Sequence, residues 1–300
     1  MAHAHEHSHP HHHDLSPGRI RALWWAFLIN AVFLVVEVIG GILSGSLALL
    51  ADAGHMLTDV GALGVALLVA HVSRRPASPR RTFGYGRTEV LSGLLNGLTL
   101  WLVVGVIAYE AVRRMMHPPE VDVSIMLAVA VAGLLANVAS AAVLYSHRKA
   151  DLNVKGAFLH LAADSAGSVG VIAAGVAIAL GGWFIVDPIV SLLLGLLILW
   201  SSWGLVKESA HILLEGAPAG LNLADVRREL EALEGVCGCH DLHAWLIGSG
   251  EPLLTAHLLI EAEADPIGVL EAARETASSR FGIEHVTFQV EHERCLDLHP

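Results

Sequence analysis

Cysteine and charge are both scarce in this chain. Only 3 cysteines occur in 300 residues, and 16% of the residues are charged. All three thiols fall in the last third of the chain, a usage that excludes a disulfide framework and favours reduced cysteines. Three further signatures are missing: an HExxH motif, a nucleophile paired with a general base, and a glycine-rich nucleotide loop. Their absence argues against a hydrolase and against ATP as the energy source.

The N-terminus lacks the pattern of a signal peptide. No basic start leads into a short apolar stretch, so we expect no cleaved leader. Residues 1–18 instead form a His-rich tail, containing HAHEHSHPHHH, that is too polar to build a packed core. We interpret it as a native metal-collecting tail of accessory importance. A purification tag is the alternative, although Glu, Ser and Pro interrupt the histidines.

Apolar residues, in contrast, are abundant. They make up 54% of the chain, and the mean hydropathy is +0.58, well above a soluble domain. Six stretches are long enough to cross a bilayer, and only a helix satisfies the backbone there. These stretches are residues 22–43, 47–72, 90–112, 123–146, 157–180 and 184–206. The sequence therefore predicts a six-helix membrane domain over residues 19–208 and a separate soluble domain over residues 209–300.

Charge is distributed unevenly along this predicted topology. Eleven Lys and Arg residues flank one side of the spans, whereas Arg113 and Arg114 alone flank the other, which places both termini in the cytoplasm. The soluble domain holds five basic and sixteen acidic residues and accounts for the net charge of −11. Such a domain repels phosphates and attracts cations, so we exclude nucleic acid as a partner.

Two identical motifs of ionisable residues lie inside the spans, which contain no Lys or Arg. His55 precedes Asp59, and His160 precedes Asp164, by four residues, so each pair shares one face of its helix. Two such faces opposed would offer two imidazoles and two carboxylates, which suits zinc better than magnesium or calcium. The alternative is a polar contact within or between helices, for which Ser, Thr or Asn would suffice at ~1 kcal/mol.

Other buried polar residues receive smaller roles. Asp52 lies three residues before His55 on the same face and is a possible accessory group, either supporting the ligands or guiding metal entry. Four further residues are interpreted as interhelical hydrogen-bonding groups, with an access path as the alternative: Glu37, Asn96, Asn137 and Asp187.

The soluble domain has its own pattern of elements. Asn222 is a suitable N-cap for a helix that ends near residue 234. Residues 236–247 and 252–261 alternate like strands, residues 266–281 suit a helix, and residues 286–292 suit a last strand. This order predicts an α+β layer. Cys237 and Cys239 could hold a soft metal, but inert reduced thiols are the favoured interpretation.

Four segments together resemble the cation diffusion facilitator family of metal/proton antiporters. They are LADAGHMLTDVGAL, RTFGYGRTEVLSGLLN, LHLAADSAGS and HDLHAW, and the similarity runs from about Arg19 to the end. The resemblance implies a homodimer in which each protomer is an all-α six-helix membrane bundle with a C-terminal α+β, ferredoxin-like (metallochaperone-like) cytoplasmic domain used for regulation and dimerisation. It also implies that His55, Asp59, His160 and Asp164 form the transport site.

The resemblance also implies metal binding in the soluble domain. His240, His257 and Glu291 match positions of a cytoplasmic metal site, and His285 or Glu284 lies near a further one. A lone histidine on a strand is more often a surface residue, so this assignment competes with a plain structural one. Between the second and third spans, Ser78, Arg81 and Tyr85 replace the ligands that some members have, so no loop site is expected.

These observations predict efflux of Zn²⁺, with Co²⁺ or Cd²⁺ as alternatives, by an integral protein of the bacterial inner membrane. Imidazoles titrate near neutrality, so protons are the natural counter-ion. The expected partners are a second copy of the chain, the lipid bilayer, divalent metal ions and protons, and no nucleotide is expected. Two other classes remain as alternatives at this point: a membrane-bound metal sensor or receptor, and a membrane metalloenzyme.

Overall fold

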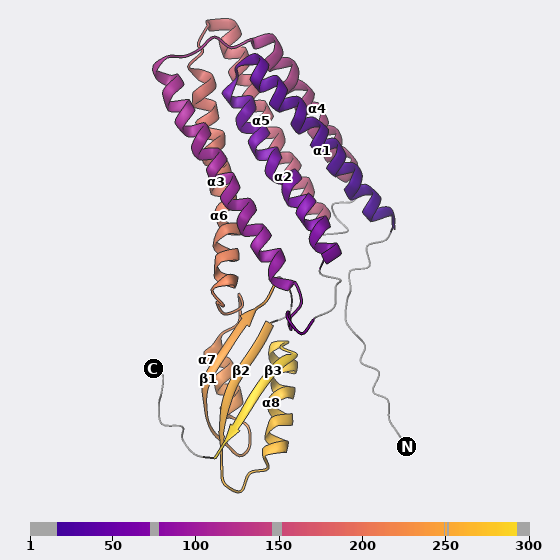
Figure 1. Cartoon of the computed structure of the whole chain (residues 1–300), viewed down its shortest axis with the longest axis vertical. Coiled ribbons are helices and arrows are strands. Elements are labelled where there is room, and N and C mark those ends of the chain that lie inside the picture. The colour runs from indigo at the N-terminus through magenta and orange to yellow at the C-terminus, as the bar shows by residue number, and fades with distance from the viewer. Residues whose placement is uncertain (1–16, 73–77, 146–151, 249, 251, 293–300) are drawn as a thin grey trace. The chain divides into compact units, whose positions relative to one another are not determined.

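The computed structural model describes residues 17–72, 78–145, 152–248, 250 and 252–292. Within helices, only the backbone is described at residues 17–27, 59, 62–63, 65–72, 139–145 and 152–163. In the described part, six long helices precede a small α+β domain (Figure 1).

The long helices fall where the six apolar stretches predict them. Their bounds are α1 Pro17–Ser44, α2 Leu47–Val72, α3 Gly86–Met116, α4 Val123–Tyr145, α5 Leu152–Gly181 and α6 Val186–Leu213. Over the described residues, three of them are long and apolar enough to cross a membrane: α3, α6 and the part of α5 from Asp164 to Gly181. The described apolar parts of the other three are shorter.

Two compact units share these helices. The described residues up to Gly64 pack with Leu100–Leu199, and the second unit combines residues 65–99 with the chain from Trp200 onward. Both α3 and α6 run from one unit into the other.

Small residues allow close helix packing in the first unit. Ala48, Ala130 and Ala174 are buried in one cluster that joins α2, α4 and α5. On α1, a Cβ added to Gly40 would lie 2.7 Å from Val129 Cγ2 of α4, so the two backbones approach at a distance only glycine permits. Along their lengths, α4 lies beside α5 and beside α1 (Figure 1).

Asp187 of α6 caps the N-terminus of α2. Its carboxylate accepts hydrogen bonds from Ser46 Oγ at 2.6 Å, from Leu47 N at 2.7 Å and from Ala48 N at 3.2 Å. These donors are buried, and an anion at this helix end also complements the helix dipole. The prediction that Asp187 is an interhelical hydrogen-bonding group is confirmed, and the contact fixes the start of the helix that carries His55.

The α+β domain has the predicted order of helix, two strands, helix and strand. Its elements are α7 Leu223–Glu231, β1 Val236–Leu246, β2 Pro252–Ile260, α8 Pro266–Phe281 and β3 His285–Glu291. The predicted first helix is too long at its end, because Ala232 already forms the C-cap. Asn222 is the N-cap, as expected, and its side chain accepts a bond from Ala224 N.

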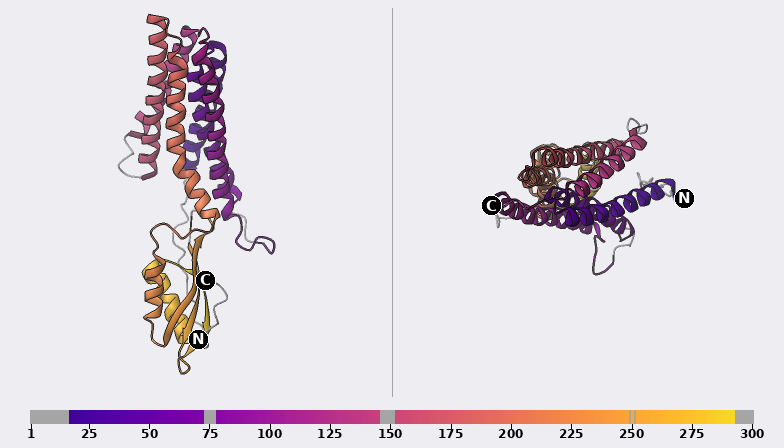
Figure 2. Two further views of the ribbon diagram at one scale, coloured as in Figure 1. Left: turned by 90° about the vertical axis from the view of Figure 1, so that its left-hand side faces the viewer. Right: turned by 90° about the horizontal axis from the view of Figure 1, so that it is seen from above.

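The sheet has the order β1-β2-β3, with β1 antiparallel and β3 parallel to β2. On β2, alternate residues Leu254, Ala256, Leu258 and Ile260 are buried, and they share a core with α7 and α8. Both helices therefore cover one face of the sheet (Figure 2, left view). Side chains of the opposite parity, His257 among them, point to the uncovered face.

Candidate metal centres

The two HxxxD helices bring one ligand of each motif into contact. His55 Nε2 of α2 lies 3.3 Å from Asp164 Oδ1 of α5, and their side chains are 24% and 13% exposed. Asp59 and His160 lie on the same two helices, but their side chains are outside the described residues. The structure therefore describes two of the four predicted side chains, His55 and Asp164. It brings a nitrogen atom of His55 close to an oxygen atom of Asp164 between α2 and α5.

Asp52 lies beside this contact. Its Oδ2 accepts from Ser168 Oγ at 3.5 Å, and Ser168 also bonds the carbonyl of Asp164 at 3.3 Å. A Cβ at Gly167 would stand 3.3 Å from Asp52 Oδ1, so the small residue leaves room for the carboxylate. Asp52 is 8% exposed, and its carboxylate lies against Ser168 of α5, one helical turn after Asp164.

The remaining buried polar residues differ among themselves. Glu37 of α1 is 1% exposed, and its Oε2 has no hydrogen-bond partner among the residues that the structure describes. An interhelical hydrogen bond from this atom is therefore not found. Asn96 and Asn137 are half-buried on α3 and α4, and their predicted role stays a prediction.

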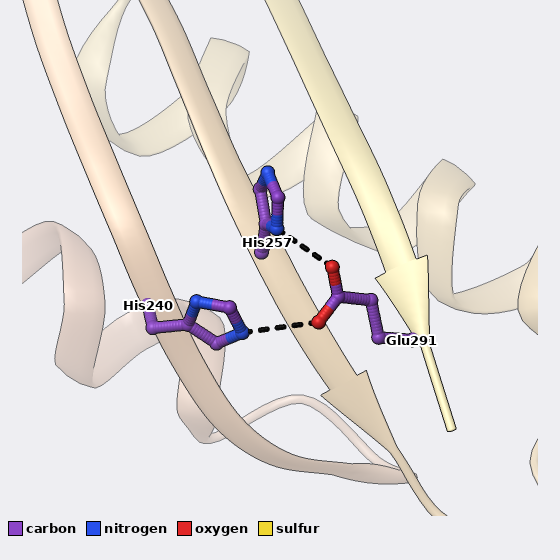
Figure 3. A group of neighbouring side chains, drawn as sticks. All are labelled: His240, His257 and Glu291. Carbon is purple, nitrogen blue, oxygen red and sulfur yellow. Dashed lines mark hydrogen bonds and ion pairs between the residues drawn. The ribbon is translucent and has the colours of Figure 1, made fainter. Parts of the chain in front are cut away.

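A second cluster lies on the uncovered face of the sheet. Glu291 Oε1 accepts from His257 Nδ1 at 2.7 Å and from Gln289 Nε2 at 2.7 Å, while its Oε2 lies 3.2 Å from His240 Nε2. Figure 3 shows the carboxylate between the two imidazole rings. One ligand atom from each of these three side chains lies within 4.8 Å of the others, close enough to share one metal ion.

Strand register explains why these three residues meet. His240 pairs with His257 across β1 and β2, and Leu259, two residues beyond His257, pairs with Glu291 on β3. A register shift follows His240, at Asp241, whose φ is +51°. Asp241 Oδ2 also lies 3.8 Å from His257 Nε2, which adds a second carboxylate to the rim of the cluster.

His285 lies apart from this cluster. It begins β3, six residues before Glu291, which corresponds to roughly 20 Å of extended strand. Its ring instead lies 5.9 Å, centroid to centroid, from that of Phe83. The described residues therefore join His240, His257 and Glu291 and leave His285 at the far end of the strand, consistent with the separate position that the resemblance implies for it.

The two thiols of β1, Cys237 and Cys239, are poorly placed to bind one metal ion together. Cys239 is buried, and burial raises the pKa of its thiol to about 11, with the Glu231 carboxylate adding to the effect and Arg227 opposing it. Cys237 is exposed, and its Sγ lies 3.3 Å from the carbonyl of Leu259. One buried and one exposed thiol do not form a pair, in agreement with the inert interpretation.

Apolar helices that carry a half-buried His–Asp contact, followed by an α+β domain with its own His/Glu cluster, are the features of an integral membrane protein that handles cations. Residues 23–214 match the family model of the cation efflux transmembrane domain, and residues 218–293 match that of the cation efflux protein cytoplasmic domain. The chain belongs to the cation efflux family. It is a transporter of metal ions and not an enzyme, which removes the metalloenzyme alternative.

Relatives cover nearly the whole chain. The metal cation efflux system protein CzcD of Cupriavidus metallidurans is 42% identical over 94% of this chain and 90% of its own length. The zinc transporter ZitB of Escherichia coli is 42% identical over 98% of this chain and 94% of its own. The cadmium, cobalt and zinc/H⁺-K⁺ antiporter of Bacillus subtilis is 38% identical over 91% and 89%.

Among solved structures, the metal-bound C-terminal domain of the CzcD transporter from Cupriavidus metallidurans matches 24% of this chain and 99% of its own. The identity is 36%, and the TM-score is 0.23.

Proposed function

We propose that this chain exports Zn²⁺ from the cytoplasm in exchange for protons, using an intramembrane site formed by His55, Asp59, His160 and Asp164. The observation that carries the proposal is the 3.3 Å contact between His55 Nε2 and Asp164 Oδ1, because it opposes the two HxxxD faces. An ionisable pair in this setting is costly, and it is retained where an ion passes.

The donor set favours zinc. Two imidazole nitrogens and two carboxylate oxygens make a four-coordinate site that a small d¹⁰ ion accepts readily. The names of the relatives support the choice, since they include two zinc transporters and an antiporter of cadmium, cobalt and zinc. Cobalt and cadmium remain the nearest competitors.

Protons supply the driving force in this proposal. Zinc binds neutral imidazoles and ionised carboxylates, so loading the site releases protons on the cytoplasmic side. Protons arriving from the other side then compete zinc off the same atoms. The two ions would alternate at one site, and no nucleotide is required.

The sheet cluster serves as a second metal site with a regulatory role. His240, His257 and Glu291 provide three ligands, and we propose that Zn²⁺ bound there draws together the acidic domains of a homodimer by offsetting their mutual repulsion. Distances between spin labels on the two protomers, with and without zinc, test this regulatory role; equal distances would remove it.

We further propose six membrane spans, both termini in the cytoplasm, and a ferredoxin-like fold for the α+β domain.

Flux into sealed proteoliposomes tests the transport proposal. Purified chain should move zinc faster than protein-free liposomes do, and faster than it moves cobalt or cadmium. A metal sensor would bind zinc in the same preparation without any flux. His55→Asp should shift selectivity towards cadmium, because oxygen and negative charge replace a nitrogen ligand; an unchanged zinc-to-cadmium ratio would count against the selectivity argument.

A further inference from the structure

A pocket that the metal sites do not use opens within the second unit. Its volume is about 820 Å³, within the usual size of ligand pockets. The loop before α3, the first turns of α3, the end of α6 and the last residues of β1 all contribute to its lining. Gly86 lets these parts meet, because a Cβ there would lie 3.0 Å from Ile247 Cγ2.

The rim of this pocket is positively charged. Arg80, Arg81 and Arg87 line it, and Glu215 is the one acidic residue among its lining residues. Arg87 Nη2 donates to Glu215 Oε1 at 2.7 Å, which leaves Arg80 and Arg81 in excess. This local positive charge contrasts with the net charge of −11 of the whole chain, and it favours an anionic ligand over a cationic one.

The wall of the pocket is apolar. Phe83 is 56% exposed and Leu91 is 48% exposed, although both line a concavity. Tyr85 and Trp245 extend the same surface, and the Arg81 guanidinium stacks over the Tyr85 ring at 4.4 Å from its centroid. A small soluble anion would satisfy the arginines but leave this apolar surface uncovered.

Two membrane-length helices end at the pocket. α3 begins at Gly86 and α6 ends at Leu213, and both are long and apolar enough to span a bilayer. Aromatic and basic side chains at such helix ends are typical of the lipid headgroup level. We infer that the pocket binds an anionic phospholipid, with its phosphate on Arg80 and Arg81 and its acyl chains along Phe83 and Leu91.

Native mass spectrometry of the full chain, delipidated in detergent and titrated with phosphatidylglycerol or phosphatidylcholine without zinc, tests this inference. Phosphatidylglycerol should bind in a saturable way and more tightly than phosphatidylcholine. The double variant Arg80→Gln/Arg81→Gln should weaken that binding by about 30-fold, since each surface arginine contributes about a fivefold factor. The matched control is Arg227→Gln/Arg228→Gln, which removes two adjacent exposed arginines on α7 and should leave the affinity unchanged.

Four results would overturn the inference. Equal affinity for the two lipids would show that charge does not select the ligand. Equal weakening by both double variants would show that the lipid responds to the overall charge of the protein and not to the arginines of this pocket. Displacement of phosphatidylglycerol by soluble glycerol phosphate at comparable concentration would make this a site for a soluble anion. Leu91→Gln, which keeps the arginines and removes apolar wall, should also weaken lipid binding; an unchanged affinity would contradict the assigned pose.

Discussion

His55 and Asp164 belong to two separate helices, whereas His240, His257 and Glu291 lie on three neighbouring strands of one sheet. Imidazole nitrogens and carboxylate oxygens are thus held by packed helices in one cluster and by a hydrogen-bonded sheet in the other. Backbone hydrogen bonds lock the strands in register, while α2 and α5 pack through small residues and side-chain contacts that a sliding motion could exchange. The proposed transport role requires release of the ion, which suits the helical pair, and the proposed regulatory role requires a bound ion, which suits the sheet.

Loss of the helical site should reduce zinc transport more than any other change. Asp164→Ala removes the carboxylate that faces His55, and zinc flux into proteoliposomes should fall by more than about 100-fold. Thr99→Ala is the control, because the Thr99 hydroxyl bonds only to Leu95 O of its own helix among the residues described. Near-normal flux in a folded Asp164→Ala protein would refute the transport site.

The next effect concerns the sheet cluster by itself. In an Asp164→Ala background, Glu291→Gln should weaken the remaining zinc binding by about 10- to 100-fold, since one charged ligand between two imidazoles is lost. Calorimetry on the full chain measures this affinity. Glu271→Gln, an exposed control on α8 outside the cluster, should leave the affinity unchanged.

A third prediction addresses how α2 is anchored. Asp187→Ala leaves buried donors at Ser46 and Leu47 without their acceptor, and should lower the free energy of unfolding by about 2–3 kcal/mol. Asp122→Ala removes an exposed cap of α4 and should cost about 1 kcal/mol or less. Denaturation midpoints in detergent compare the two. Equal losses would show that the buried contact is no more than an ordinary cap.

The smallest expected effect lies in the thiols of β1. Because burial raises the pKa of the Cys239 thiol from its ordinary value of 9.0 to about 11, the folded chain favours the neutral thiol. The stability that this preference contributes is complete below about pH 9 and is lost as the pH rises towards 11. At neutral pH iodoacetamide should therefore label Cys237 and spare Cys239, as read by peptide mass spectrometry. Comparable labelling of both would contradict the buried assignment.

The sequence predicts the local features well and the long-range ones poorly. Apolar length places the six helices, and Asn222 and the alternating strands place the elements of the α+β domain, because these signals are carried by neighbouring residues. The contact of Asp187 with Ser46 spans 141 residues, so composition could suggest its kind but not its partner. The register shift at Asp241 and the basic pocket both arise from tertiary packing, which no local pattern encodes.

The candidate site shows the same division. The repeated His-x-x-x-Asp spacing predicts the ligands, but the contact between His55 and Asp164 depends on the packing of α5 on α2. For the sheet cluster, single histidines on strands gave a weak signal, and the resemblance supplied the grouping that the strand register then explains. His285 shares a strand with Glu291 but not a neighbourhood, because six residues of extended chain separate them.

If zinc and protons alternate at one intramembrane site, zinc transport must move protons the opposite way across the membrane. Proteoliposomes holding the purified chain and a trapped pH indicator are given an imposed pH gradient, more acidic on the side to which zinc is delivered. We expect this gradient to drive zinc uphill, zinc movement to carry protons the opposite way, and Asp164→Ala to abolish both. Zinc flux that ignores the size and direction of the gradient would contradict antiport and indicate a passive facilitator.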